Sequence, residues 1–182
     1  MNASRDMFTT EALACVRRPR SFLKIKFSDC DAFGHLYNVR YLGKMIDERE
    51  EQVAEHYPEL YQYSLLRQAN WVVVSTDIRY LRPAAQGELV CIESSVIEAG
   101  SYGIKLEIAM LCRRAEELKA VAWTTMRWVD LTRGAVARHP PALQRIVDDL
   151  LLRVDEHSID ARTRILRSRP GGTAAARHSR EE

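Results

Sequence analysis

Apolar and polar residues alternate along five stretches of the chain, and this period of two predicts β-strands. The clearest is the fourth stretch, where Ile104, Leu106, Ile108 and Met110 fall on the core side and Glu107 between them falls on the solvent side. We predict strands at residues 21–27, 71–81, 88–99, 102–114 and 118–131. Short turns separate the last four, so we expect them to form an antiparallel meander.

Two other stretches repeat their apolar residues at the spacing of an α-helix. The first covers residues 38–57, where Asn38 is suited to cap the start and Pro58 to end the helix. The second covers residues 139–154 and carries prolines near its first turn. Charged side chains crowd residues 47–52, which we interpret as the solvated end of the first helix. These elements predict an α+β fold whose first helix covers one face of the sheet.

The remaining segments show no clear period and divide the chain into a folded part and its flanks. Residues 1–20 are interpreted as an N-terminal arm and residues 58–70 as an irregular connection. We expect the folded domain at residues 21–143 and a helical extension at residues 144–169. Residues 170–182 contain too few apolar side chains to form a core, so a disordered tail is expected.

The composition narrows the classes of protein to which this fold can belong. The 182 residues include 27 basic and 25 acidic side chains, a balance that gives no general attraction to nucleic acid. No apolar run reaches the length of about 18 residues that crosses a membrane. The four cysteines form no Cys-x-x-Cys pair, which argues against a zinc site or a disulfide framework. We therefore expect a cytoplasmic protein without a metal.

The segment Ser28–Leu42, SDCDAFGHLYNVRYL, contains candidate catalytic residues between the first predicted strand and the first predicted helix. It carries Asp31, then Gly34, which allows the backbone to bend, and then the free N–H groups of the first helical turn. A carboxylate that faces such a helix start can act on a carbonyl carbon as nucleophile or general base, while an N–H holds the oxyanion. Asp29 is interpreted as a turn residue whose carboxylate accepts nearby amides.

Three histidines are further candidates for chemistry. His35, inside the segment, is interpreted either as a substrate-orienting or proton-handling group or as a hydrogen-bonded structural histidine. His56 and His139 lie at the ends of predicted elements, where we expect surface positions. No cluster of histidine, cysteine and acidic residues has the spacing of metal ligands.

Extended by one residue, the stretch FSDCDAFGHLYNVRYL resembles the active-site segment of the hotdog-fold acyl-CoA thioesterases, in the branch that includes 4-hydroxybenzoyl-CoA thioesterase. Two later stretches, IRYLRPAAQGELV and WVDLTRGAVARHPPAL, are similar to other strands of that family and the turns that follow them. The resemblance covers residues 22–143. It implies a hotdog fold, in which a long antiparallel sheet wraps around a central helix, here with an added C-terminal helix.

The resemblance also implies catalytic roles within the segment. The second acid of the family motif is catalytic and corresponds to Asp31, and the oxyanion donor corresponds to the backbone N–H of Asn38. His35 and Asn38 also resemble the HVNN stretch of acyl-carrier-protein thioesterases. Those relatives carry asparagine where this chain has Phe33 and Tyr37, so their full catalytic set does not carry over.

Four residues are implied to contact the substrate. Gly34 and Tyr37 belong to the turn before the helix. Arg79 and Arg82 correspond to positions where family members approach the phosphates of coenzyme A, which the arginine fork suits. The alternative for both arginines is an exposed position on a strand without a ligand.

The function implied by the resemblance is hydrolysis of an acyl-CoA or acyl-carrier-protein thioester to the free acid and thiol. It needs no cofactor, since coenzyme A is part of the substrate. Two alternatives stay open: a hotdog hydratase or dehydratase that depends on a histidine such as His35, and an acyl-CoA-binding module without turnover. The family implies a homodimer or homotetramer, because a second copy closes the open sheet edge. The sequence does not specify the acyl group.

Overall fold

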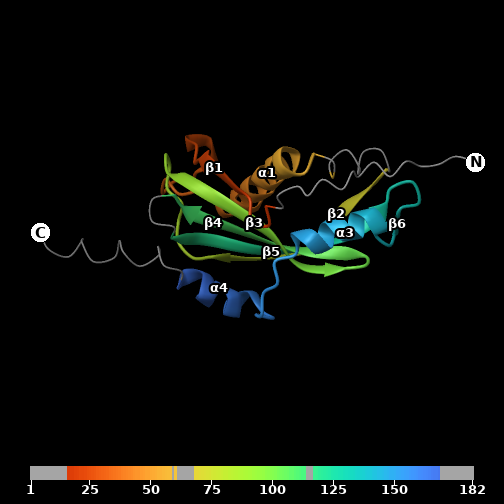
Figure 1. Ribbon diagram of the computed structural model, residues 1–182. Coiled ribbons are helices and arrows are strands. Elements are labelled where there is room, and N and C mark those ends of the chain that lie inside the picture. The colour runs from red at the N-terminus through yellow and green to blue at the C-terminus, as the bar shows by residue number, and fades with distance from the viewer. Residues whose placement is uncertain (1–15, 59, 61–67, 114–116, 169–182) are drawn as a thin grey trace, which may run out of the picture.

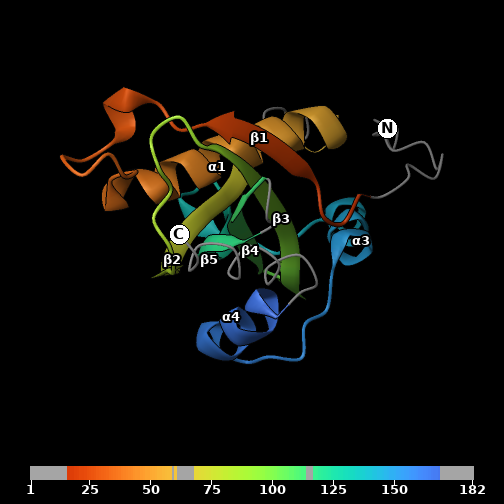
Figure 2. The same cartoon turned by 90° about the vertical axis from the view of Figure 1, so that its left-hand side faces the viewer.

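The structure is a computed structural model and describes residues 16–58, 60, 68–113 and 117–168. An antiparallel sheet lies at its centre, with a long helix on one face and a short helix on the other (Figure 1, Figure 2). The strands are β1 (Arg20–Lys24), β2 (Ala69–Tyr80), β3 (Leu89–Gly100), β4 (Gly103–Cys112), β5 (Leu118–Asp130) and β6 (Ala135–Val136). The helices are α1 (Asn38–His56), α3 (Pro141–Leu150), α4 (Ile159–Arg167) and a short 3-10 helix, η1 (Phe27–Asp29).

Three of the predicted segments lie wholly or largely outside the described residues. They are the N-terminal arm up to residue 15, most of the 58–70 connection, and the tail at 170–182.

The strands are hydrogen-bonded in the order β1-β3-β4-β5-β2, and β6 pairs with β5. The predicted meander is correct for β3, β4 and β5 but wrong for β2, which pairs with β5 instead of β3. Trp71 near the start of β2 lies opposite Trp128, and Tyr80 at its end lies opposite Ala120. β1 and β2 therefore form the two edges of this order, because the chain crosses one face of the sheet through α1 between them.

One face of α1 packs on the sheet and builds the main core. The buried residues of the helix are Tyr41, Met45, Arg49 and Gln52. Gln52 Nε2 donates to Ser21 Oγ at 2.9 Å and to the carbonyl of Ile92 at 3.0 Å. Its Oε1 accepts from Ser94 Oγ at 2.5 Å. The predicted solvated end of the helix is thus wrong for Arg49 and Gln52, and Gln52 ties α1 to the backbone of the sheet.

The opposite face of the sheet is covered by α4, a helix that the sequence did not predict (Figure 2). Ser158 caps its start by accepting the N–H of Ala161 at 3.2 Å. Ile159 and Leu166 pack on apolar side chains of β3, β4 and β5. Glu107, predicted on the solvent side of its strand, is only 4% exposed because α4 lies over it. The range 144–169, expected as a helical extension, includes most of α3 and all of α4.

A buried ion pair joins α4 to the sheet. Arg162 Nε lies 2.7 Å from Glu107 Oε2, and Arg162 Nη2 lies 2.9 Å from Oε1, so the pair is bidentate. Trp123 Nε1 also donates to Glu107, at 3.1 Å, and Glu156 lies 3.3 Å from Arg162 Nη1. Burial alone would lower the pKa of Arg162, but the carboxylates of Glu107 and Glu156 raise it. The positive charge of Arg162 therefore compensates the buried negative charge of Glu107.

His139 lies in an aromatic cluster and not on the surface as predicted, with only 4% of it exposed. Its neighbours Trp71 and Trp128 meet edge to face, with ring centroids 4.9 Å apart. Trp71 Nε1 donates to His139 Nε2 at 3.0 Å, and His139 Nδ1 lies 3.0 Å from Gln144 Oε1. Because Nε2 accepts a hydrogen bond, the neutral ring carries its proton on Nδ1. Burial lowers the pKa of His139 below its usual value, although the bond to Gln144 opposes the shift.

We expect His139 to make the folded protein less stable in acid. Its lowered pKa means that the unfolded chain binds a proton more readily, so stability is complete above about pH 6.5 and falls as the pH drops below that value. Melting temperatures measured from pH 7.5 to pH 5 should show a shallower decline in His139→Gln than in the wild type. The exposed His157→Gln variant is the control and should keep the wild-type slope. Equal slopes in all three proteins would contradict the prediction.

Candidate active site

The segment between η1 and α1 folds into a tight hairpin. The N–H of Tyr37 donates to the carbonyl of Asp29 at 3.0 Å, and the N–H of Asp31 donates to the carbonyl of His35 at 2.8 Å. Gly34 closes the turn with a φ of +72°, in the left-handed region that favours glycine. The structure therefore brings Asp31, Gly34 and His35 into one turn and leads the chain from it directly into α1.

The carboxylate of Asp31 is held by this turn through one oxygen. Asp31 Oδ1 accepts the N–H of Phe33 at 2.9 Å and the N–H of His35 at 3.1 Å. Among the described residues, Oδ2 has no hydrogen-bond donor, and the side chain is partly exposed. The carboxylate that accepts hydrogen bonds from the amides of the turn is thus that of Asp31, and not that of Asp29 as predicted. One oxygen fixes the orientation of the group while the other stays available for chemistry.

Asp29 has a different environment, since it is only 8% exposed and pairs with the helix. Its Oδ2 lies 3.0 Å from Lys44 Nζ, an ion pair by distance that lacks the alignment of a hydrogen bond. Lys44 lies on the second turn of α1, so the pair connects η1 to the helix. Asp29 is therefore placed to hold the hairpin against α1.

Cys30, between the two aspartates, is kept as a thiol. Its pKa is raised by burial and then by the negative charges of Asp29 and Asp31. The thiol donates to the carbonyl of Lys26 at 3.3 Å. A raised pKa disfavours the thiolate, which is the nucleophilic form of cysteine. This leaves the carboxylate of Asp31 as the nucleophile candidate of the hairpin.

The start of α1 is open toward the hairpin. Asn38 is the first helical residue and not the cap that the sequence predicts; Tyr37 is at the cap position, and its side chain makes no capping bond. The first turn contains no acidic residue, so the positive end of the helix dipole is not neutralised there. Tyr80 of β2 donates to the carbonyl of Asn38 at 3.1 Å and holds this end of the helix against the sheet.

The loop between β2 and β3 supports the hairpin from the side. The N–H of Leu36 donates to the carbonyl of Ala84, and the N–H of Gln86 donates to the carbonyl of Gly34, both at 2.8 Å. The hydroxyl of Tyr41 accepts the N–H of Ala84 at 2.9 Å. These bonds connect the hairpin, the loop and α1, so the candidate catalytic turn is built on a hydrogen-bonded frame.

The two arginines predicted to bind phosphate are already paired with carboxylates. Arg79 Nε lies 2.7 Å from Asp160 of α4, on the face of the sheet opposite α1, and the pairing raises the pKa of Arg79 and lowers that of Asp160. Arg82 Nε lies 2.9 Å from Glu117. The structure therefore separates Arg79 from the hairpin by the sheet, whereas Arg82 lies in the loop that supports the hairpin.

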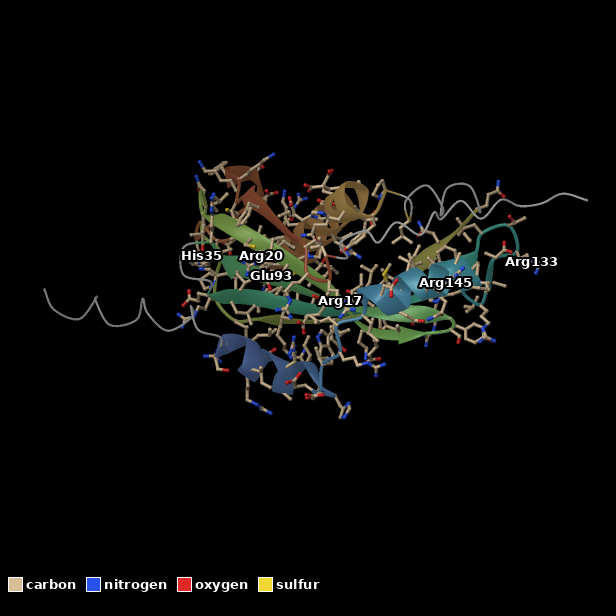
Figure 3. All side chains as sticks on the ribbon, in the orientation of Figure 1. Arg17, Arg20, His35, Glu93, Arg133 and Arg145 are labelled. Carbon is tan, nitrogen blue, oxygen red and sulfur yellow. The ribbon has the colours of Figure 1, made fainter. Side chains whose placement is uncertain are left out.

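A cavity of about 530 Å³ lies at the other end of α1. Its walls include Arg49, Val53, Trp71, Leu106, Met126 and Val147. Leu131 and Thr132, next to Arg133, also line it. Figure 3 shows His35 at one end of the molecule and Arg133 at the other, so hairpin and cavity are separate within one chain.

Two residues near these sites were missed from the sequence, namely Tyr80 and Arg49. Tyr80 was expected to be only a strand residue. Arg49 was hidden among charged neighbours, but it follows Tyr41 and Met45 at intervals of four residues. That spacing places it on the buried side of the helix, and this signal could have revealed it.

Residues 25–147 match the thioesterase-like superfamily in sequence. The chain belongs to this superfamily. The match contains the hairpin, α1 and most of the sheet, and it supports thioester hydrolysis in general. A comparison with curated protein sequences finds no match.

Solved structures, thioesterases among them, share the hotdog fold with this superfamily member. The probable thioesterase YbaW from Escherichia coli is 20% identical with a TM-score of 0.66, over 73% of this chain and 98% of that one. A 1,4-dihydroxy-2-naphthoyl-CoA thioesterase from Synechocystis is 17% identical with a TM-score of 0.64, over 73% and 97%. The Staphylococcus aureus protein SAV2348, in complex with CoA, is 10% identical with a TM-score of 0.65, over 72% and 82%. The predicted hotdog fold is confirmed.

Two further features concern the described part of the chain. It holds no group of three or more histidine, cysteine, aspartate or glutamate residues placed to bind a metal ion. None of its helices is long and apolar enough to cross a membrane.

Proposed function

We propose that the protein hydrolyses an acyl-CoA or acyl-carrier-protein thioester, with Asp31 as nucleophile or general base. One observation carries the proposal. Two N–H groups fix Asp31 at Oδ1, while Oδ2 accepts no hydrogen bond from any described residue, in a hairpin that leads into a helix start without a side-chain cap. A thioester carbonyl between these two features would meet an acid on one side and the N–H of Asn38 on the other.

Both routes need the same two groups. As a general base, Asp31 removes a proton from water, and the hydroxide adds to the carbonyl carbon. As a nucleophile, Asp31 forms an anhydride that water then hydrolyses. In each case the carbonyl oxygen becomes an oxyanion at the N–H of Asn38, the carbon–sulfur bond breaks, and the leaving thiolate takes a proton. His35, whose N–H already donates to Asp31, is the proposed proton-handling neighbour.

Acid–base catalysis and one oxyanion donor together can lower the barrier enough to hydrolyse an activated thioester. Acid–base help contributes about 10²–10⁴-fold and one oxyanion donor about 3 kcal/mol. No metal is proposed. Coenzyme A as the thiol carrier is supported by the Staphylococcus aureus structure solved with CoA and by the naphthoyl-CoA substrate in the name of the Synechocystis enzyme. Gly34 and Tyr37 would border the bound thioester, and Arg82, with Arg79 only if it leaves Asp160, would approach the phosphates.

We also propose that two copies pair through β2. This edge strand exposes three consecutive valines, Val72, Val73 and Val74, so both of its sides are apolar. Antiparallel pairing of two β2 strands would place the start of one beside the end of the other. Trp71 near the start lines the cavity, while Tyr80 at the end contacts Asn38. The cavity of one copy would then approach the hairpin of its partner.

We expect Val74→Lys to produce a monomer with reduced turnover, because a charge on the edge opposes strand pairing. Val74 is the most exposed of the three valines, at 62%. Light scattering at micromolar concentration measures the mass, and the wild type should be a dimer or larger. Tyr102→Lys, in the turn between β3 and β4, is a control that places the same charge at another exposed apolar position, at 52% exposure. A wild-type monomer would rule out the pairing.

A panel of acyl-CoAs with a free-thiol reporter tests the function. Release of thiol supports hydrolysis, and activity that persists in EDTA supports catalysis without a metal. Formation or loss of a double bond without thiol release would indicate a hydratase or dehydratase. Binding without either reaction would indicate an acyl-CoA-binding module.

A further inference from the structure

Among the described residues that line the cavity is a buried cation, Arg49, two of whose nitrogens have no hydrogen-bond partner there. Arg49 is only 8% exposed, and its Nε and Nη1 have no hydrogen-bond partner within the part of the chain that the structure describes. The other side chains that face this space are largely apolar, including Val53, Leu106, Met126 and Val147. Buried donors are almost always paired in folded proteins, so two free N–H-bearing nitrogens beside an open volume point to an absent acceptor.

The described neighbours of Arg49 do not supply that acceptor. The guanidinium carbon lies 5.8 Å from the centre of the Tyr57 ring, a cation–π contact that uses the face of the group. The N–H bonds lie in the plane of the guanidinium, so stacking leaves them free. Glu50 lines the same cavity, and its charge acts on Arg49, but its side chain is exposed. Burial lowers the pKa of Arg49, more than Tyr57 and Glu50 raise it.

The shape of the cavity suits a ligand that consists of an apolar carbon chain with one polar end. A volume of about 530 Å³ is within the usual range of small-molecule sites. Apolar walls favour methylene or ring carbons, and a single cation favours an anionic oxygen at one point. Arg49 lies roughly 16 Å along the helix axis from Asn38, given the rise of about 1.5 Å per residue. That span within one copy is long for an acyl chain, so the hairpin beside this cavity would be the one of the proposed partner copy.

We propose that Arg49 binds a carboxylate at the far end of the acyl group, so that the preferred substrates are thioesters of dicarboxylic acids. This inference rests on the proposed thioesterase function and on its placement of a hairpin beside the cavity. The carboxylate would accept from Arg49 while the carbon chain contacts the apolar walls. A charge-assisted bond between largely apolar walls is stronger than one in water.

The test compares acyl-CoAs that differ only in the terminal group. Adipoyl-, suberoyl- and sebacoyl-CoA are each measured against hexanoyl-, octanoyl- and decanoyl-CoA. For at least one pair we expect kcat/KM to be about tenfold higher for the dicarboxylyl substrate, the size of one moderate charged hydrogen bond. The chain length with the largest ratio reports the distance between the reacting carbonyl and Arg49.

Three variants assign the preference to the cation. Arg49→Met keeps the volume without the charge, and the ratio should fall toward one. Glu50→Gln removes the nearby negative charge, so the ratio should rise. Arg145→Met, an exposed arginine on α3, is the matched control and should keep the wild-type ratio (Figure 3). A ratio near one in the wild type, or an unchanged ratio in Arg49→Met, would overturn the proposal.

A binding measurement separates this proposal from the function on which it rests. Free suberate should raise the melting temperature of the wild type more than octanoate does, and this difference should disappear in Arg49→Met. Absence of thiol release from every acyl-CoA would reject the thioesterase function. Thiol release without a preference for dicarboxylyl groups would reject only the role of Arg49.

Discussion

Asp31→Asn is expected to reduce kcat by about 100-fold or more, with little change in KM or in melting temperature. The asparagine oxygen can still accept the N–H groups of Phe33 and His35, so the turn should keep its shape. What the substitution removes is the negative charge, and with it the ability to attack a carbonyl or to take a proton from water. Steady-state kinetics with a thioester that the wild type hydrolyses, together with a thermal melt, measure both effects.

Asp29→Asn is the matched control for this experiment. It removes the same charge two residues earlier, where the carboxylate is buried beside Lys44. We expect a loss of stability rather than of turnover, because that ion pair holds the hairpin to α1. Full activity in Asp31→Asn, combined with inactive but folded Asp29→Asn, would assign catalysis to the other acid. Full activity in both variants would reject a mechanism driven by a carboxylate of the hairpin.

Arg162→Met should lower the free energy of unfolding by about 3 kcal/mol, the lower end of the range for breaking a buried ion pair. Glu107 would keep the hydrogen bond from the indole N–H of Trp123 but lose both hydrogen bonds from the guanidinium. The loss is limited because α4 can detach from the sheet and allow water to reach Glu107. Urea denaturation measures the change.

The exposed Arg164→Met variant on the same helix controls for the loss of a surface arginine and should change stability by less than about 0.5 kcal/mol. Adding Glu107→Gln to Arg162→Met should recover part of the loss, since no unpaired charge then remains. If Arg162→Met is as stable as Arg164→Met, the pair does not anchor α4.

The strands and α1 could be predicted because their periodicity is local. The order of the strands could not, since alternation shows which residues face a core but not which strand is the neighbour; β2 therefore paired with β5 unexpectedly. α4 was missed because four of its nine residues are charged, and its buried side carries Arg162 and Thr163 between Ile159 and Leu166. Its stability comes from Ile159, Leu166 and the pairing of Arg162, which only the folded sheet supplies.

In the candidate site, too, features local in sequence could be predicted and features built from distant segments could not. Asp31, Gly34 and His35 are close in sequence, and the structure places them in one turn. Their roles in catalysis stay predictions. The cavity was not predictable, because it is enclosed by α1, α3 and strands that are distant in the chain. Arg79 illustrates the same limit, since its partner Asp160 belongs to the helix that was missed.

The position of α4 also restricts how copies of the protein can assemble. The face of a sheet opposite its central helix is a natural surface on which two dimers could stack into a tetramer. Here α4 occupies part of that face and contributes Ile159 and Leu166 to its apolar contacts. Stacking over β4 and β5 would require α4 to leave and would strand Glu107 without Arg162. While α4 stays in place, another copy could not pack on the part of the sheet that this helix covers.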